Sequence, residues 1–162
     1  MARTASVVTQ RMVELLTAQD AGINPALAQL AIDSGDALAP AHIVSQNVAF
    51  ELAERSQGAK YRVVQVYPDR VRNTLTEKFR NFSGKVRMVA EVRISQDRLE
   101  GLEDRLRLYV DAVTQVLDSN RGSWGQGAYY AGGYEAAYEP VRHGGKNFLQ
   151  IAKVTFEVDL SA

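Results

Sequence analysis

Two stretches of this 162-residue chain alternate between apolar and polar side chains, and this alternation limits the folds open to it. Successive side chains of a β-strand point to opposite faces of the sheet, so a period of two predicts a strand with one buried face. In residues 85–95 one face is apolar and the other charged (Val86, Met88, Ala90, Val92 and Ile94 against Lys85, Arg87, Glu91 and Arg93). Residues 147–160 repeat the pattern (Phe148, Ala152, Val154, Phe156, Val158 and Leu160 against Lys153, Thr155, Glu157 and Asp159). We therefore expect two long strands, each with a charged outer face.

The segment between these strands predicts the longest helix of the chain. Apolar residues from Leu99 to Leu117 recur at intervals of three and four, which makes a stripe wide enough to cover a sheet. Asp97 starts a capping-box-like pattern and predicts the first turn of this helix, whereas Asn120 and Gly122 predict its end.

The first forty residues predict a helical region. Residues 4–18 carry one apolar stripe, and a second, short helix follows and is ended by Gly35. Residues 43–56 are ambiguous, but the good helix formers in residues 47–56 favour a helix there.

A further strand is predicted at residues 61–68, where β-forming side chains gather and Pro68 is the expected end. Residues 134–141, "YEAAYEPV", predict another strand. The order of elements indicates an α+β fold: an antiparallel or mixed β-sheet of about four strands, covered by one long helix, with an N-terminal helical region. We divide the chain into that helical region, residues 1–40, and an α+β domain, residues 41–162, and expect them to form one compact unit.

Residues 69–84 lie between two predicted strands and are too long for a tight turn, so the sequence leaves open an extended hairpin arm or a short helix. Seven basic and three acidic side chains occur in residues 69–93, with phenylalanines among them. Such a mixture binds phosphates and stacks on bases. The other interpretation is a solvated hairpin or a charged face against another subunit, which the equal totals of 19 basic and 19 acidic residues favour. The contact candidates in this segment are Arg70, Arg72, Lys78, Phe79, Arg80 and Phe82.

Residues 121–148 hold seven of the twelve glycines, four of the seven tyrosines and the single tryptophan. Tyr and Trp dominate the energetics of protein interfaces, which predicts an adhesive loop. The alternative is that these aromatics pack on their own sheet while the glycines make turns, and both interpretations stay open for different tyrosines. The contact candidates are Trp124, Tyr129, Tyr130, Tyr134 and Tyr138.

The sequence offers little support for catalysis. It has no cysteine and only two histidines, neither in a metal-ligand spacing, and the glycine run lacks the residues of a phosphate-binding loop. No apolar run approaches the ~18 residues of a membrane span, and the N-terminus lacks a signal-peptide core. We expect a protein of the cytoplasm that is not an enzyme and has no cofactor, no metal and no membrane partner.

The order of these elements and their amino-acid sequences resemble those of a known protein family. "VYPDRVRN…EKFRNFSGKVRMVAEVRISQDRLEGLEDRLRLYVDAVTQVL", followed by a glycine-aromatic segment and "GGKNFLQIAKVTFEVDL", is similar to tail terminator or tail-completion proteins of tailed bacteriophages. The resemblance covers roughly residues 40–160 and is one of pattern, without a short invariant motif.

The resemblance implies a structural virion protein of the tail or neck, assembled in the bacterial cytoplasm. It implies a homo-oligomeric ring, a hexamer, that ends growth of the tail tube and joins the tail to the head connector. The implied partners are the chain itself, the tail tube protein, the head-tail connector proteins and DNA passing through the ring lumen. Two alternatives remain: another neck or connector adaptor, and a nucleic-acid-binding module that uses the basic residues of 70–87.

Overall fold

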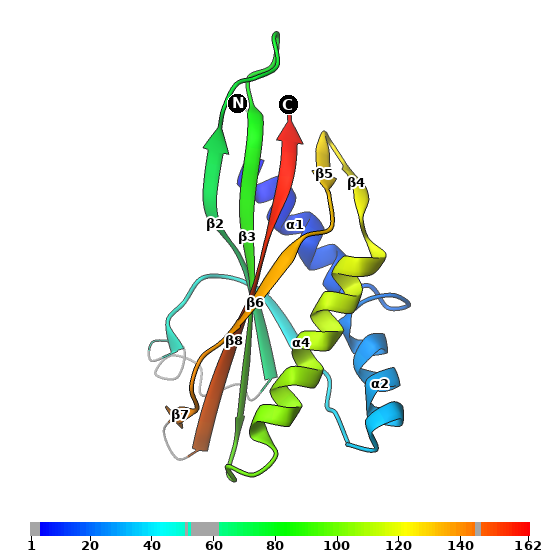
Figure 1. Cartoon of the computed structure of the whole chain (residues 1–162), viewed down its shortest axis with the longest axis vertical. Helices are drawn as coiled ribbons and strands as arrows, with labels where there is room; N and C mark the ends of the chain where they lie inside the picture. Colours follow the sequence, from blue (N-terminus) through cyan, green and yellow to red (C-terminus); the bar gives the residue numbers. More distant parts are fainter. Residues whose placement is uncertain (1–3, 51, 53–61, 145–146) are drawn as a thin grey trace.

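The computed structural model describes residues 4–50, 52, 62–144 and 147–162. The described elements follow one another as α1 (Thr4–Thr17), α2 (Ile23–Ser34), β1 (His42–Ser45), β2 (Arg62–Asn73), β3 (Ser83–Gln96), α4 (Leu102–Ser119), β4 (Gly122–Gly125), β5 (Ala128–Tyr130), β6 (Tyr134–Tyr138), β7 (Arg142–Gly144) and β8 (Asn147–Ser161) (Figure 1). The chain has an α+β fold with N-terminal helices, as the sequence predicts.

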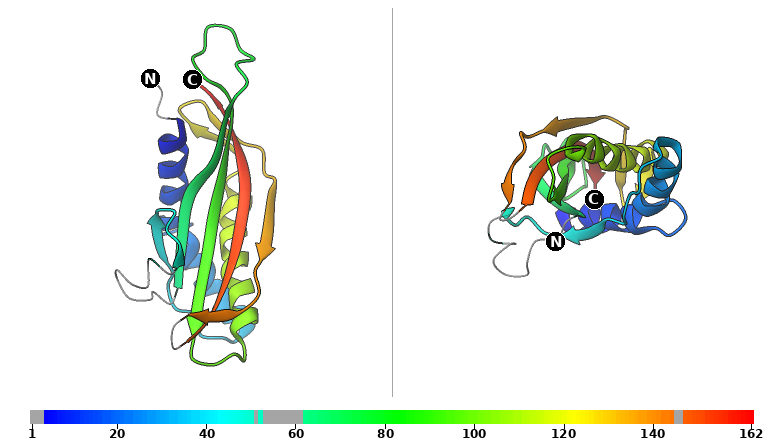
Figure 2. Two further views of the ribbon diagram at one scale, coloured as in Figure 1. Left: turned by 90° about the vertical axis from the view of Figure 1, so that its left-hand side faces the viewer. Right: turned by 90° about the horizontal axis from the view of Figure 1, so that it is seen from below.

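The strands form one mixed, strongly curled sheet that resembles half a barrel (Figure 2). Its main path runs β1-β2-β3-β8-β5-β4, and β6 and β7 also pair with β8. Every described pairing is antiparallel except the parallel one between β1 and β2. The expected number of about four strands was therefore wrong, since eight are present in the described part of the chain. The additional strands, β1, β4, β5 and β7, have three or four residues each, which is too few to show a clear alternation.

The central strands β3 and β8 pair along their whole lengths, from Ser83 opposite Ser161 to Gln96 opposite Phe148. On the other side of β3, β2 continues to Asn73 and does not end at Pro68, so that expected boundary was wrong. Proline is tolerated on an edge strand and at a bulge, because no ladder hydrogen bond then needs its missing N–H. Pro68 satisfies both conditions: β1 pairs with β2 only as far as Val66, and the register shifts just after Pro68.

Two helices, not one, cover the concave face of the sheet. α1 contacts β1, β2 and β3, whereas α4 contacts β3 and β8, and α2 packs mainly on α4. The apolar faces of α1, α4, β3 and β8 join in one core, whose members include Met12, Leu16, Met88, Val92, Leu106, Val113, Val154 and Phe156. The N-terminal helices thus complete the core that the long helix leaves partly open.

Helix α4 ends at Ser119 with Asn120 as its C-cap, as predicted, but it begins at Leu102 and not at Asp97. Gly101 precedes the first turn with a φ of 78°, a left-handed conformation that ends any helix approaching from residue 97. The predicted first turn is instead an irregular loop, and Leu99 is exposed.

Two other expectations concern residues 43–56. Ile43, Val44 and Ser45, which the sequence left ambiguous, belong to β1 and are extended. Half of the helix expected over residues 47–56 lies outside the described residues, and in the described half Phe50 and Leu52 are helical whereas residues 47–49 are not.

The glycine-tyrosine segment is an interrupted strand and not a free loop, and its β6 lies within the strand predicted at residues 134–141. β5, β6 and β7 pair in turn with residues 159–160, 152–156 and 147–149 of β8, so together they line almost the whole second edge of that strand. One break, after β5, contains Gly132, whose φ of 112° favours glycine. The glycines therefore allow one segment to follow the curvature of β8.

Candidate interaction surface

The arm, residues 69–84, is a hairpin, which decides between the two alternatives that the sequence left open. β2 and β3 stay paired as far as Asn73 and Gly84, and residues 74–82 connect them. The connecting loop projects beyond the rest of the sheet at one end of the molecule (Figures 1 and 2). A Cβ atom on Gly84 would lie 1.9 Å from the carbonyl oxygen of Arg72, so only glycine allows this close approach of the two strands.

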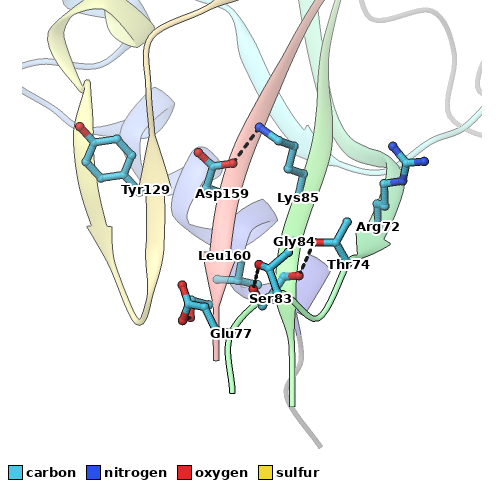
Figure 3. Close-up of a pocket in the computed structure, with 11 residues that line it drawn as sticks. Arg72, Thr74, Glu77, Ser83, Gly84, Lys85, Tyr129, Asp159 and Leu160 are labelled. Atoms are coloured by element: carbon cyan, nitrogen blue, oxygen red, sulfur yellow. Dashed lines mark hydrogen bonds and ion pairs between the residues drawn. The ribbon is translucent and has the colours of Figure 1, made fainter. Parts of the chain in front are cut away.

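Side-chain hydrogen bonds fix the base of the arm. The side-chain oxygen of Asn73 accepts hydrogen bonds from the backbone N–H groups of Leu75 at 3.1 Å and Ser83 at 3.0 Å, the first of which forms an Asx turn. The hydroxyl of Thr74 donates to the carbonyl of Ser83 at 2.9 Å, and the hydroxyls of Thr76 and Ser83 are 2.8 Å apart. Figure 3 shows Thr74 and Ser83 close together at the base of the arm, with the hydrogen bond between them drawn as a dashed line. The loop therefore leaves the sheet in a defined direction.

The tip of the arm exposes apolar side chains. Phe79 is completely exposed and Leu75 is 58% exposed. Both residues have left-handed backbone, with φ values of 65° and 49°. This conformation is costly for a non-glycine residue, and such strain clusters at active sites, ligand clamps and switch regions. Phe82 differs, because it is buried in the core and anchors the arm.

Four cations meet on the outer face of β2 and β3, and we call them the cation quartet: Arg70, Arg72, Lys85 and Arg87. The register places Arg70 opposite Arg87 and Arg72 opposite Lys85, so like charges face each other across the strands. Such pairs are unfavourable. The four side chains line a small hollow of about 190 Å³ together with Glu157.

Carboxylates neutralise only half of the quartet. Lys85 lies 3.0 Å from Asp159 and 3.8 Å from Glu157, and Arg87 lies 3.5 Å from Asp69. The hydrogen bond and charge of Asp159 raise the pKa of the Lys85 ammonium. Within the described part of the chain, Arg70 and Arg72 have no ion pair.

An open groove of about 420 Å³ runs beside the base of the arm. Arg72 and Tyr129 lie on opposite sides of the Lys85–Asp159 pair within it (Figure 3). The groove thus links the two segments that the sequence singled out. Of the remaining basic candidates, Arg80 lies 3.7 Å from Glu77, and the exposed Lys78 lies in the loop itself.

The aromatic candidates of the glycine-tyrosine segment divide into two groups. Trp124 and Tyr130 are buried and pack on Phe156, with ring centroids 5.4–6.1 Å apart, so within this chain they belong to the core. Burial raises the pKa of Tyr130 to about 12. The other three tyrosines, Tyr129, Tyr134 and Tyr138, are about half exposed and remain available to a partner.

The structure also contains a buried polar cluster that the sequence did not predict. Glu91 and Arg93 were expected on the exposed face of β3, but both are buried. The carboxylate of Glu91 accepts hydrogen bonds from the Tyr67 hydroxyl at 2.9 Å and from Arg93 Nε at 2.6 Å. Arg93 and Gln65 also hydrogen bond to the backbone of Val48, so the cluster holds the segment after β1 against the sheet. Burial raises the pKa of Tyr67 well above its usual range.

Other chemistry has little support among the described residues. His143 is exposed and stacks on Phe148 with ring centroids 5.5 Å apart. Among the residues that the structure describes, no three His, Asp or Glu side chains are grouped to hold a metal ion. None of the described helices is both long and apolar enough to cross a membrane.

Comparison of the chain with protein-family models finds no match. Comparison with curated proteins likewise finds no match. The function must therefore be argued from the surface itself, which offers cations and apolar groups for contact.

Proposed function

We propose that this chain is a structural subunit that assembles with copies of itself into a ring at the head-proximal end of a phage tail tube. In this proposal it acts as the tail terminator and tail-completion proteins that its sequence resembles: it ends tube growth and joins the tail to the head connector. The ring is a hexamer located in the virion neck, its partners are the tail tube and connector proteins, and DNA passes through its lumen.

The arm is the observation that carries this proposal. A completely exposed Phe79 in left-handed backbone contributes no buried area to a monomer, and it lies beyond a hairpin base that hydrogen bonds fix. Buried against another subunit, an aromatic ring of this size contributes a large apolar area at low entropic cost. A contact between two different surfaces of identical subunits closes into a ring without a second component when the rotation between neighbours allows it.

The arm is better suited to contact a partner through its side chains than to pair its β2 edge with a strand of that partner. Beyond Val66, the outer edge of β2 is unpaired within the described residues, but it carries Pro68, a bulge and the charged Arg70 and Arg72. Proline, bulges and charges are the features by which edge strands avoid pairing with other strands. We therefore assign the contact to the side chains of the arm.

The cation quartet supports a second candidate function, a nucleic-acid-binding module. Four cations on one sheet face suit a row of phosphates, and such binding weakens steeply as salt increases. The carboxylates of Asp69, Glu157 and Asp159 lie among the cations and oppose a phosphate backbone. Self-assembly is therefore the better supported of the two.

Measuring the mass of the purified chain by light scattering over a range of concentrations tests the proposal. We expect a closed oligomer with the mass of about six chains and a ring in electron micrographs. Phe79→Ala should weaken this oligomer while circular dichroism and folding stability stay unchanged, because the side chain makes no core contact. A chain that stays monomeric at high concentration and is absent from virions would refute the proposal.

A further inference from the structure

The charges of this neutral chain are segregated along its length. No lysine or arginine occurs between Arg11 and Arg55, an interval that contains all of α2, whereas residues 69–87 carry six basic and two acidic side chains. In the structure, the arm and α2 lie toward opposite ends of the long axis (Figures 1 and 2). The arm therefore carries more basic than acidic side chains, whereas α2, toward the other end, carries one acidic side chain, Asp33, and no basic one. Helix α4, on which α2 packs, carries both signs there, with Arg105 and Arg107 beside Glu103 and Asp104.

The basic end has charges that its own chain does not neutralise. Arg70 faces Arg87 and Arg72 faces Lys85 across the hairpin, and Arg70 and Arg72 have no carboxylate partner among the described residues. An exposed arginine that faces another cation is stabilised when it binds a carboxylate, to which the guanidinium donates two parallel hydrogen bonds. The quartet thus favours a carboxylate-bearing partner.

The end of α2 has the opposite imbalance. Asp33 lies in its last turn and Asp36 follows the C-cap Gly35, with no basic residue in that turn. Carboxylates at a helix C-terminus meet the negative end of the helix dipole and are unfavourable, whereas cations there are stabilising. A cation from another molecule would relieve this cost, as a carboxylate would relieve the cost in the quartet.

Apolar groups accompany both charged surfaces. Ile32, next to Asp33, is 75% exposed on α2, and the arm presents the exposed Leu75 and Phe79. A stable interface combines an apolar centre with a polar rim. The two surfaces are therefore complementary in charge and alike in apolar character.

From these observations we infer that the arm of one copy docks on the C-terminal end of α2 of a second copy, with Arg70 and Arg72 against Asp33 and Asp36 and the exposed tip of the arm near Ile32. The inference rests on the self-association proposed above, and it adds the surface that receives the arm. Because the two surfaces lie toward opposite ends of the molecule, a single chain does not bring them together. A second copy satisfies them either head to tail, around a ring, or side by side in an antiparallel pair.

Charge reversal tests this contact. Arg70→Glu with Arg72→Glu should weaken self-association about tenfold or more, and so should Asp33→Lys with Asp36→Lys, since each places like charges against each other. The two variants mixed in equal amounts should associate as the wild type does, and so should one chain that carries all four changes. Sedimentation velocity measures the association, and circular dichroism checks the fold.

Matched controls are Arg142→Glu and Glu135→Lys, which reverse exposed charges on β7 and β6 and should leave association unchanged. The inference is overturned when the reversals associate like these controls, or when the mixture and the fourfold variant fail to recover. It is also overturned when Arg70→Glu with Arg72→Glu abolishes binding to a short DNA duplex but leaves self-association intact.

The same experiment separates this inference from the ring proposal. A dimeric mass with full rescue supports the arm–α2 contact and refutes the ring. If the charge-reversal variants still form the ring, the ring proposal is supported and the arm–α2 contact is refuted. A strictly monomeric wild type refutes both.

Discussion

The arm and the glycine-tyrosine segment both combine aromatic side chains with turn-forming residues, yet they hold opposite positions in the fold. The arm leaves the sheet at Asn73 and carries a fully exposed Phe79. The glycine-tyrosine segment instead lies along β8 and contributes Trp124 and Tyr130 to the core. The difference teaches that composition identifies a segment with large contact-forming side chains. It does not tell whether those side chains pack on their own sheet or stay exposed for another molecule.

The largest expected effect separates two neighbouring tyrosines of the glycine-tyrosine segment. Tyr130→Ala should lower the free energy of unfolding by about 3–5 kcal/mol, because it removes a fully buried ring that packs on Trp124 and Phe156. Tyr129→Ala, one residue away, removes a half-exposed ring and should change the free energy of unfolding by no more than about 0.5 kcal/mol. Urea unfolding followed by circular dichroism measures both. Equal losses in the two variants would erase the distinction between core and surface in this segment.

Two arginines of β3 differ in the same way: Arg87 lies in the exposed half near the arm, whereas Arg93 lies in the covered half. Arg93→Met should cost about 3 kcal/mol of folding stability, because it leaves Glu91 buried without its closest cation. Arg87→Met, at the exposed pair with Asp69, should cost less than about 1 kcal/mol. Both values come from urea unfolding at neutral pH. A larger loss for Arg87→Met would mean that the arm end contributes more to stability than the covered half.

The smallest effect concerns pH. Burial raises the pKa of Tyr130 to about 12, whereas a tyrosine in the unfolded chain ionises near pH 10. Above about pH 10 the unfolded state therefore loses this proton while the folded state keeps it, and stability falls as pH rises from about 10 toward 12. In Tyr130→Phe this decline should be shallower by about 1.4 kcal/mol per pH unit. Urea unfolding at several pH values tests this, and parallel curves for wild type and variant would contradict it.

Elements with long, regular patterns could be predicted from the sequence. The alternation of residues 85–95 and 147–160 identified β3 and β8, and the apolar stripe ending at Leu117 identified α4. Gly35 ends α2 in a left-handed conformation, as expected of a C-cap glycine. In each case neighbouring residues in the sequence carry the signal, because side-chain direction repeats with the period of the element.

Elements that depend on distant partners could not be predicted. β5 and β7 have only three residues each and exist because β8 offers an unpaired edge beside them. Pro68 stays inside β2 because β1 has already stopped pairing there, which residues near Pro68 do not reveal. Glu91 and Arg93 look like exposed charges in a strand pattern, but the segment around Val48 covers them.

For the candidate surface too, local sequence predicted some features and distant residues decided the others. The sequence identified the residues of the arm, but their exposure and the pairing of like charges in the cation quartet depend on the register of two strands. By itself the sequence determined the main strands, the long helix and the uneven distribution of charge, since these are properties of local order along the chain. Only the tertiary structure decided which aromatics are core and which charges lack a partner, because burial and electrostatic pairing are set by residues far apart in sequence.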